Sequence, residues 1–159
     1  RRHSFPTRRS SDLKHYGSGN MQKIQSEFVG KKLGATKDTN VIWYSVVSSA
    51  PGTEGYMSAE ETLKAQKEHH SAATAVLIDS DGTVGRAYEA KTTPHMFIIN
   101  SAGKLVYDGA IDDRPTTDQA DVTKAKPLFV NALNAVITNK TVEMASNKPY
   151  GCGVKYAKN

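Results

Sequence analysis

Cysteine is the residue type in this chain with the most distinctive chemistry, and the sequence contains only one, Cys152. A thiolate is a nucleophile that can be oxidised or joined to a second sulfur, which makes Cys152 a candidate catalytic residue. A single cysteine excludes an internal disulfide and a C-x-x-C pair within these 159 residues. Any thiol chemistry carried by this sequence therefore depends on one side chain.

The second candidate is the Thr93-Pro94 turn, which stands inside the run Lys91–Ile99, K-T-T-P-H-M-F-I-I. A threonine pair, a proline and an apolar run are typical of a cis-proline turn that leads into a buried strand. Proline lacks an N–H and therefore suits the start of a strand better than its middle. Most X–Pro bonds are trans, so the pattern alone leaves the isomer of the Thr93–Pro94 bond open; the resemblance described below favours cis. We take both residues as candidate catalytic or binding residues.

The sequence favours no metal or other cofactor. No two histidines stand four residues apart, and one cysteine offers little sulfur for zinc or copper. We therefore expect four of the histidines to be solvated: His15, His69, His70 and His95. The run from Asp79 to Gly82 is similar to the start of a calcium loop, but position twelve is Ala90. It is interpreted as a turn.

The net charge of +5 is concentrated at the start of the chain. Residues 1–13, R-R-H-S-F-P-T-R-R-S-S-D-L, contribute three of those five charges, which leaves too little for a phosphate-binding face. This run resembles translated sequencing-adapter sequence, and we expect it to be a non-native or disordered basic segment. We expect no nucleic-acid partner, no membrane span, since no apolar run approaches ~20 residues, and no signal peptide in these residues.

The rest of the chain alternates helices with strands. The run 41–47 is almost continuously apolar and is expected to be a strand buried on both faces. Asp112 and Asp113, with Asp118 and Asp121, are expected to order a loop by capping the last helix. The expected elements are helix 18–33, strand 41–47, helix 58–70, strand 75–78, short helix 83–89, strand 95–99, strand 104–109 and helix 120–138. This order predicts an α/β domain over 14–139 with a parallel βαβ core and an antiparallel edge, followed by an irregular tail over 140–159.

Four runs carry a resemblance to a known family. They are K-H-Y-G-S-G-N-M-Q at 14–22, G-R-A-Y at 85–88 leading through K-T-T-P-H-M-F at 91–97, G-A-I-D-D at 109–113, and P-Y-G-C with V-K-Y at 149–156. On these residues the chain resembles the redoxins of the alkyl hydroperoxide reductase / thiol-specific antioxidant group, within the thioredoxin-like superfamily. The resemblance extends from residue 14 to about residue 156.

The resemblance implies a thioredoxin-like fold that lacks its first strand, and an N-terminally truncated sequence. Relatives have a Cys-Pro pair a few residues before the Lys-His-Tyr run, which would fall near Arg9 and Ser10 here. A helix N-terminus and nearby cations such as Lys14 and His15 would lower the pKa of a cysteine at that position. The implied activity is thiol-dependent reduction of peroxides or disulfides, inactive as written because that cysteine is missing. The implied partners are a thiol or disulfide reductant protein, or a hydroperoxide.

Several alternatives stay open at this stage. Cys152 is either the resolving partner of the missing cysteine or a free surface thiol in a tail. The chain could instead be a redox-inactive module that binds an extended peptide at the Thr93-Pro94 loop. A nucleic-acid binder using the arginine-rich start is a third option, which the charge distribution weakens.

Proteins of the family that this chain resembles often carry export signals, so the resemblance favours an extracytoplasmic location.

Overall fold

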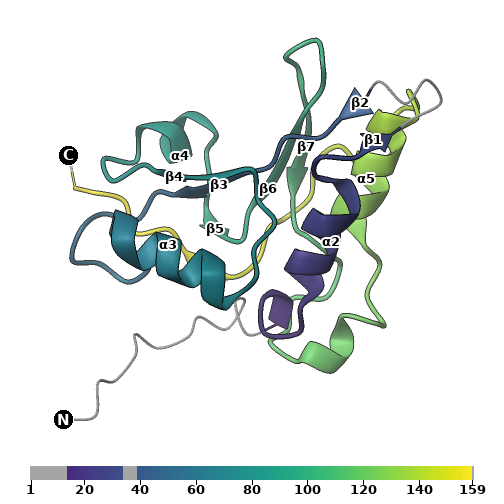
Figure 1. Ribbon diagram of the computed structural model, residues 1–159. Coiled ribbons are helices and arrows are strands. Elements are labelled where there is room, and N and C mark those ends of the chain that lie inside the picture. The colour runs from purple at the N-terminus through teal and green to yellow at the C-terminus, as the bar shows by residue number, and fades with distance from the viewer. Residues whose placement is uncertain (1–13, 34–38, 159) are drawn as a thin grey trace.

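The structure is a computed structural model that describes residues 14–33 and 39–158. It is a small mixed α/β domain with short strands, as the alternation of patterns predicts (Figure 1). The helices are α2 (Asn20–Phe28), α3 (Ala59–Glu68), α4 (Thr83–Ala87) and α5 (Leu128–Ile137), with a 3-10 turn η1 at Gln119–Asp121. The strands are β1 (Lys32–Leu33), β2 (Thr39–Asn40), β3 (Tyr44–Val47), β4 (Ala75–Ile78), β5 (Thr92–Thr93), β6 (Met96–Ile99), β7 (Leu105–Gly109) and β8 (Cys152–Gly153).

The strands pair two by two in the described part of the chain. β3 and β4 are parallel and are joined by α3, which is the predicted βαβ unit. β6 and β7 form the predicted antiparallel hairpin. β1 pairs with β2, and β5 pairs with β8, both antiparallel. No ladder of described residues joins β3 to β6, so each of these two strands is paired on one side only.

Local sequence signals explain most of the helix boundaries. Ser58 and Glu61 form a capping box at the start of α3, with both reciprocal hydrogen bonds present. Pro127 is the N-cap of α5, so the expected helix 120–138 is divided into η1 and a helix that begins after the proline. The first helix ends at Phe28, earlier than expected, and Leu33 belongs to β1.

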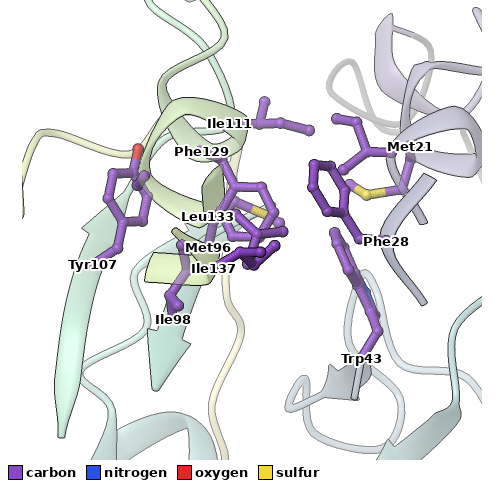
Figure 2. Close-up of a cluster of buried hydrophobic side chains, with 12 residues drawn as sticks. Met21, Phe28, Trp43, Met96, Ile98, Tyr107, Ile111, Phe129, Leu133 and Ile137 are labelled. Carbon is purple, nitrogen blue, oxygen red and sulfur yellow. The ribbon is translucent and has the colours of Figure 1, made fainter. Parts of the chain in front are cut away.

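The hydrophobic core lies between α2, α5 and the β6–β7 hairpin (Figure 2). Figure 1 shows α2 and α5 next to each other, with α3 on a separate part of the domain. Phe129 is the central side chain, because its ring contacts Trp43 and Tyr107 edge-on at centroid distances of 5.4 and 5.9 Å. Burial of each such side chain stabilises the fold by roughly 1.5–3 kcal/mol. The other core members are Met21, Ile24, Phe28, Met96, Ile98, Ile111, Ala132, Leu133 and Ile137.

The expectation that strand 41–47 is buried on both faces is wrong. Ile42, Tyr44 and Val46 are 57%, 56% and 42% exposed, while Trp43 is buried. Alternate residues of a strand point to opposite faces, so the described residues cover one face of β3 and leave the other open. An apolar run predicts a strand, but it does not show which other elements pack on each face of that strand.

The tail after residue 139 is mostly without regular elements, as expected, but part of it is ordered against the sheet. Ser146 forms an isolated bridge with Asp108, and β8 extends the edge formed by β5. No helix among the described residues is long and apolar enough to cross a bilayer.

Candidate functional site

The Thr93-Pro94 turn has the predicted conformation. The Thr93–Pro94 peptide bond is cis, and Pro94 follows β5 directly and is separated from β6 by His95. The Thr92 hydroxyl donates to the Pro94 carbonyl at 3.0 Å, which closes the turn from its own side chain. Proline thus stands just before β6, where its missing N–H costs no ladder hydrogen bond.

The structure brings all three predicted site residues together. In the β5–β8 pair, Cys152 is directly opposite Thr93, and Gly153 is opposite Thr92. The Val154 amide donates to the Lys91 carbonyl at 3.1 Å and extends this contact. Cys152 is half-buried and is not in a disulfide. The expected irregular tail therefore has a short strand at its cysteine, and that strand places the thiol beside the cis-proline turn.

A buried polar network lies in the segment just before α2, called the helix start below, and involves residues that were not predicted to form a site. Lys14 and His15 are both 0% exposed, and Asp112 is 4% exposed. The Lys14 ammonium forms an ion pair with Asp112 at 2.9 Å and donates to the Arg114 carbonyl at 2.5 Å. It also donates to the Tyr150 hydroxyl at 3.0 Å. Tyr150 in turn donates to Asp112 and lies 3.0 Å from His15 Nε2.

The protonation states in this network are mutually consistent. Burial, assisted by the neighbouring Lys14 charge and opposed by Asp112, lowers the pKa of His15 to about 4, so the ring is neutral at pH 7. Asn20 Nδ2 lies 3.0 Å from His15 Nδ1 and donates to it, which leaves the proton on Nε2 facing Tyr150. Burial and the Asp112 carboxylate raise the pKa of Tyr150, so its hydroxyl stays protonated. Tyr150 therefore donates to Asp112 and accepts from Lys14 and His15.

A second histidine–carboxylate pair supports the strand that follows the turn. The Lys91 amide donates to His95 Nδ1 at 3.2 Å, so Nε2 carries the proton that it shares with Asp108 at 2.5 Å. Burial lowers the pKa of His95, and the Asp108 hydrogen bond opposes that shift. The His95 ring also stacks on Phe97 at a centroid distance of 4.3 Å. The His95–Asp108 hydrogen bond connects the residue after Pro94 to β7.

Two expectations about these residues need correction. His15 and His95 are not solvated, since the first is 0% exposed and the side chain of the second is 4% exposed. Asp112 does accept from the Arg114 amide at 3.0 Å, as a loop-ordering residue would, but its main partner is a buried lysine. Asp118, which is also among the residues expected to order this loop, caps the 3-10 turn, whereas the N-cap of α5 is Pro127 and has no side-chain cap hydrogen bond. The described residues include no group of three or more His, Cys, Asp or Glu side chains arranged to hold a metal ion.

The C-terminal segment connects the two halves of this arrangement. Tyr150 belongs to the network at the helix start, and Cys152, two residues later, is paired with Thr93. One short segment of the tail therefore contributes both to the buried network and to the β5–β8 pair.

Comparison with known proteins shows the fold and nothing of the activity. No protein-family model matches the chain, and no curated protein matches it. A crystal structure of a hypothetical protein from Sinorhizobium meliloti 1021 is similar with a TM-score of 0.72 and 19% identity, covering 98% of this chain and 78% of that one. An uncharacterised conserved protein from Geobacillus kaustophilus is similar with a TM-score of 0.68 and 20% identity, covering 92% and 71%. The chain therefore shares an α/β architecture with these two proteins.

Proposed function

We propose that this chain is the scaffold of a thiol-dependent oxidoreductase, a redoxin of the alkyl hydroperoxide reductase / thiol-specific antioxidant group with a thioredoxin-like fold. The observation that carries the proposal is the meeting of Cys152 with the cis Thr93-Pro94 turn across the β5–β8 pair. The open sides of β3 and β6 also support it, because a thioredoxin-like sheet without its first strand would leave two such edges.

The proposed chemistry uses two sulfurs. A thiolate placed before Lys14 attacks a hydroperoxide, so that an S–O bond forms and the O–O bond breaks. The products are a sulfenic acid and an alkoxide, which takes a proton from water and leaves as an alcohol. The Cys152 sulfur then attacks the sulfenic acid, forming a disulfide and releasing water. A dithiol reductant, protein or small molecule, reduces that disulfide and is itself oxidised. Lys14 would favour the thiolate, and Thr93 and Pro94 would hold the reductant's chain by its backbone.

The printed sequence supplies one of these two sulfurs, so we propose that it is inactive as it stands. The first test is consumption of an organic hydroperoxide in the presence of dithiothreitol. The chain should show no turnover above its Cys152→Ser variant. The double variant Arg9→Cys/Ser10→Pro, which supplies the thiol where the resemblance places it, should gain turnover, and adding Cys152→Ser should slow recycling.

A second readout keeps this test decisive. Oxidation of the Arg9→Cys/Ser10→Pro variant with one equivalent of peroxide should yield an intramolecular disulfide to Cys152, detected by peptide mass spectrometry. Turnover by the unmodified chain would contradict the proposed inactivity. If a chain in which residues 1–13 are replaced by the genuine upstream segment with its Cys-Pro pair also shows neither turnover nor that disulfide, the oxidoreductase proposal is refuted.

The second candidate function is a redox-inactive module that binds an extended peptide at the Thr93-Pro94 loop. One observation favours it: the edge of β5 accepts an antiparallel strand, since β8 is bound there. Peptide affinity at this edge should be lost in Pro94→Ala and should not respond to reductant. Affinity that survives Pro94→Ala would place the peptide elsewhere.

A further inference from the structure

The segment 149–157, named here the C-terminal strap, makes three groups of contacts with the domain that are described below, and its Lys155 carbonyl also accepts from the Ala50 amide at 2.8 Å. Tyr150 is held in the buried network at the helix start. Cys152 and Gly153 are paired with β5. Tyr156 is seated against α4 and the turn that precedes it.

The third attachment is a fitted socket for an aromatic ring. Two glycines leave the space that the ring fills: a Cβ added at Gly82 would lie 2.5 Å from the Tyr156 ring, and one at Gly85 would lie 2.7 Å from its hydroxyl. That hydroxyl donates to the Ala90 carbonyl at 2.7 Å. The guanidinium of Arg86 covers the ring at 4.6 Å and donates to the Ala157 carbonyl. These contacts indicate that the end of the strap is bound to α4 and to the turn that precedes it.

The middle attachment is far less extensive. The β5–β8 ladder is two residues long, and Cys152 is flanked by Gly151 and Gly153, which add no side-chain contacts and are exposed. Short ladders with little buried apolar surface open at low free-energy cost, so the attachments on either side help to keep the middle closed. The stability of the β5–β8 pair therefore depends in part on the contacts of Tyr150 and Tyr156.

We infer that the C-terminal strap is a built-in competitor that covers the Thr92–Thr93 edge, so that a partner strand reaches this edge only when the strap detaches. The inference rests on the proposed function in taking this edge as the place where a partner chain binds. It adds that access is regulated from the Tyr156 socket. The partner it predicts is an extended segment with small residues opposite Thr92 and Thr93, as Cys152 and Gly153 are.

The chain's single cysteine provides a clean measure of strap detachment. In the full-length protein, the rate of Cys152 alkylation by N-ethylmaleimide reports how often the strap opens. Tyr156→Ala and Arg86→Ala each weaken the socket, and each should raise the rate by about tenfold or more, as expected when a local opening equilibrium shifts. Tyr44→Ala, which removes an exposed tyrosine from β3, should leave the rate unchanged.

A synthetic peptide tests the edge directly. The probe is residues 149–158 with serine in place of Cys152, which brings its own tyrosine to the emptied socket. It should bind Tyr156→Ala at least about tenfold more tightly than the unmodified chain, because it no longer competes with a fastened strap. Thermal transitions of all variants confirm that each is folded.

Equal alkylation rates in the unmodified chain, Tyr156→Ala and Arg86→Ala would overturn the inference, as would equal probe affinity in the unmodified chain and Tyr156→Ala. Neither experiment involves peroxide or turnover. The strap can thus fail while the oxidoreductase proposal stands, and the reverse also holds.

Discussion

Removing the negative charge of Asp112, which is paired with the buried Lys14, should lower the free energy of unfolding of this domain by a large fraction. The change is Asp112→Asn, which keeps the size of the side chain and one acceptor oxygen. Lys14 is 0% exposed and its ion-pair partner is Asp112 at 2.9 Å, so the variant leaves an ammonium buried without a counter-charge. Breaking one side of a buried pair typically costs about 3–5 kcal/mol. Domains of this size have a total margin of about 5–15 kcal/mol.

The assay is urea unfolding at pH 7, followed by Trp43 fluorescence, which reports the core. The matched control is Asp113→Asn, because the neighbouring carboxylate is exposed and accepts from the Lys126 amide at 2.8 Å. The control should lose less than about 1.5 kcal/mol, the net value of one such hydrogen bond. A double variant, Lys14→Met/Asp112→Leu, removes both charges and should recover most of the loss. If Asp112→Asn costs no more than Asp113→Asn, the network does not hold the helix start as described.

Three further changes test other parts of the account. The pKa of His15 is about 4 in the folded state and 6.5 in the unfolded chain, so the unfolded state binds more protons between these pH values. The free energy of unfolding should therefore fall on the order of 1–3 kcal/mol as the pH drops from 6.5 to 4. His15→Gln should flatten the pH profile of the urea midpoints. Phe129→Ala should cost about 3–5 kcal/mol in the same unfolding assay, because it empties the centre of the core, whereas Leu63→Ala, at a side chain 58% exposed, should cost less than about 0.5 kcal/mol. Ser58→Ala should lower the free energy of unfolding by about 1 kcal/mol through loss of the α3 cap, and Ser101→Ala in the exposed hairpin turn should leave it unchanged.

Signals that act over a few residues could be predicted from the sequence. The capping box at Ser58 and Glu61, the β6–β7 hairpin and the role of Pro127 each depend on neighbours within one turn of chain, and each is present. The cis bond before Pro94 is also present. The capping box, the hairpin and the position of Pro127 follow local rules, so a single sequence contains the information they need, whereas the cis isomer is favoured by the family resemblance.

The parts that failed depend on contacts between distant residues. Lys14 meets Asp112 and Tyr150 across 98 and 136 residues, and lysine is among the residue types least often buried, so nothing near residue 14 indicates its environment. The strand at Cys152 is two residues long between glycines and has no periodicity to detect. The sequence runs that carry the family resemblance contain all four residues discussed in this paragraph: Lys14, Asp112, Tyr150 and Cys152. Their presence in those runs was the sequence signal that could have grouped them.

The most direct measurement of the central claim, that Cys152 and the cis-proline turn form one site, is a cross-strand disulfide. Thr93→Cys places a second thiol opposite Cys152, in a pairing whose Cα separation of about 4.5–5.5 Å permits a disulfide. Thr92→Cys is the matched control, because its side chain points to the other face and its partner is Gly153. Under mild oxidation, mass spectrometry should find an intramolecular disulfide in Thr93→Cys and free thiols in Thr92→Cys. Free thiols in Thr93→Cys, or equal cross-linking in both variants, would contradict the account.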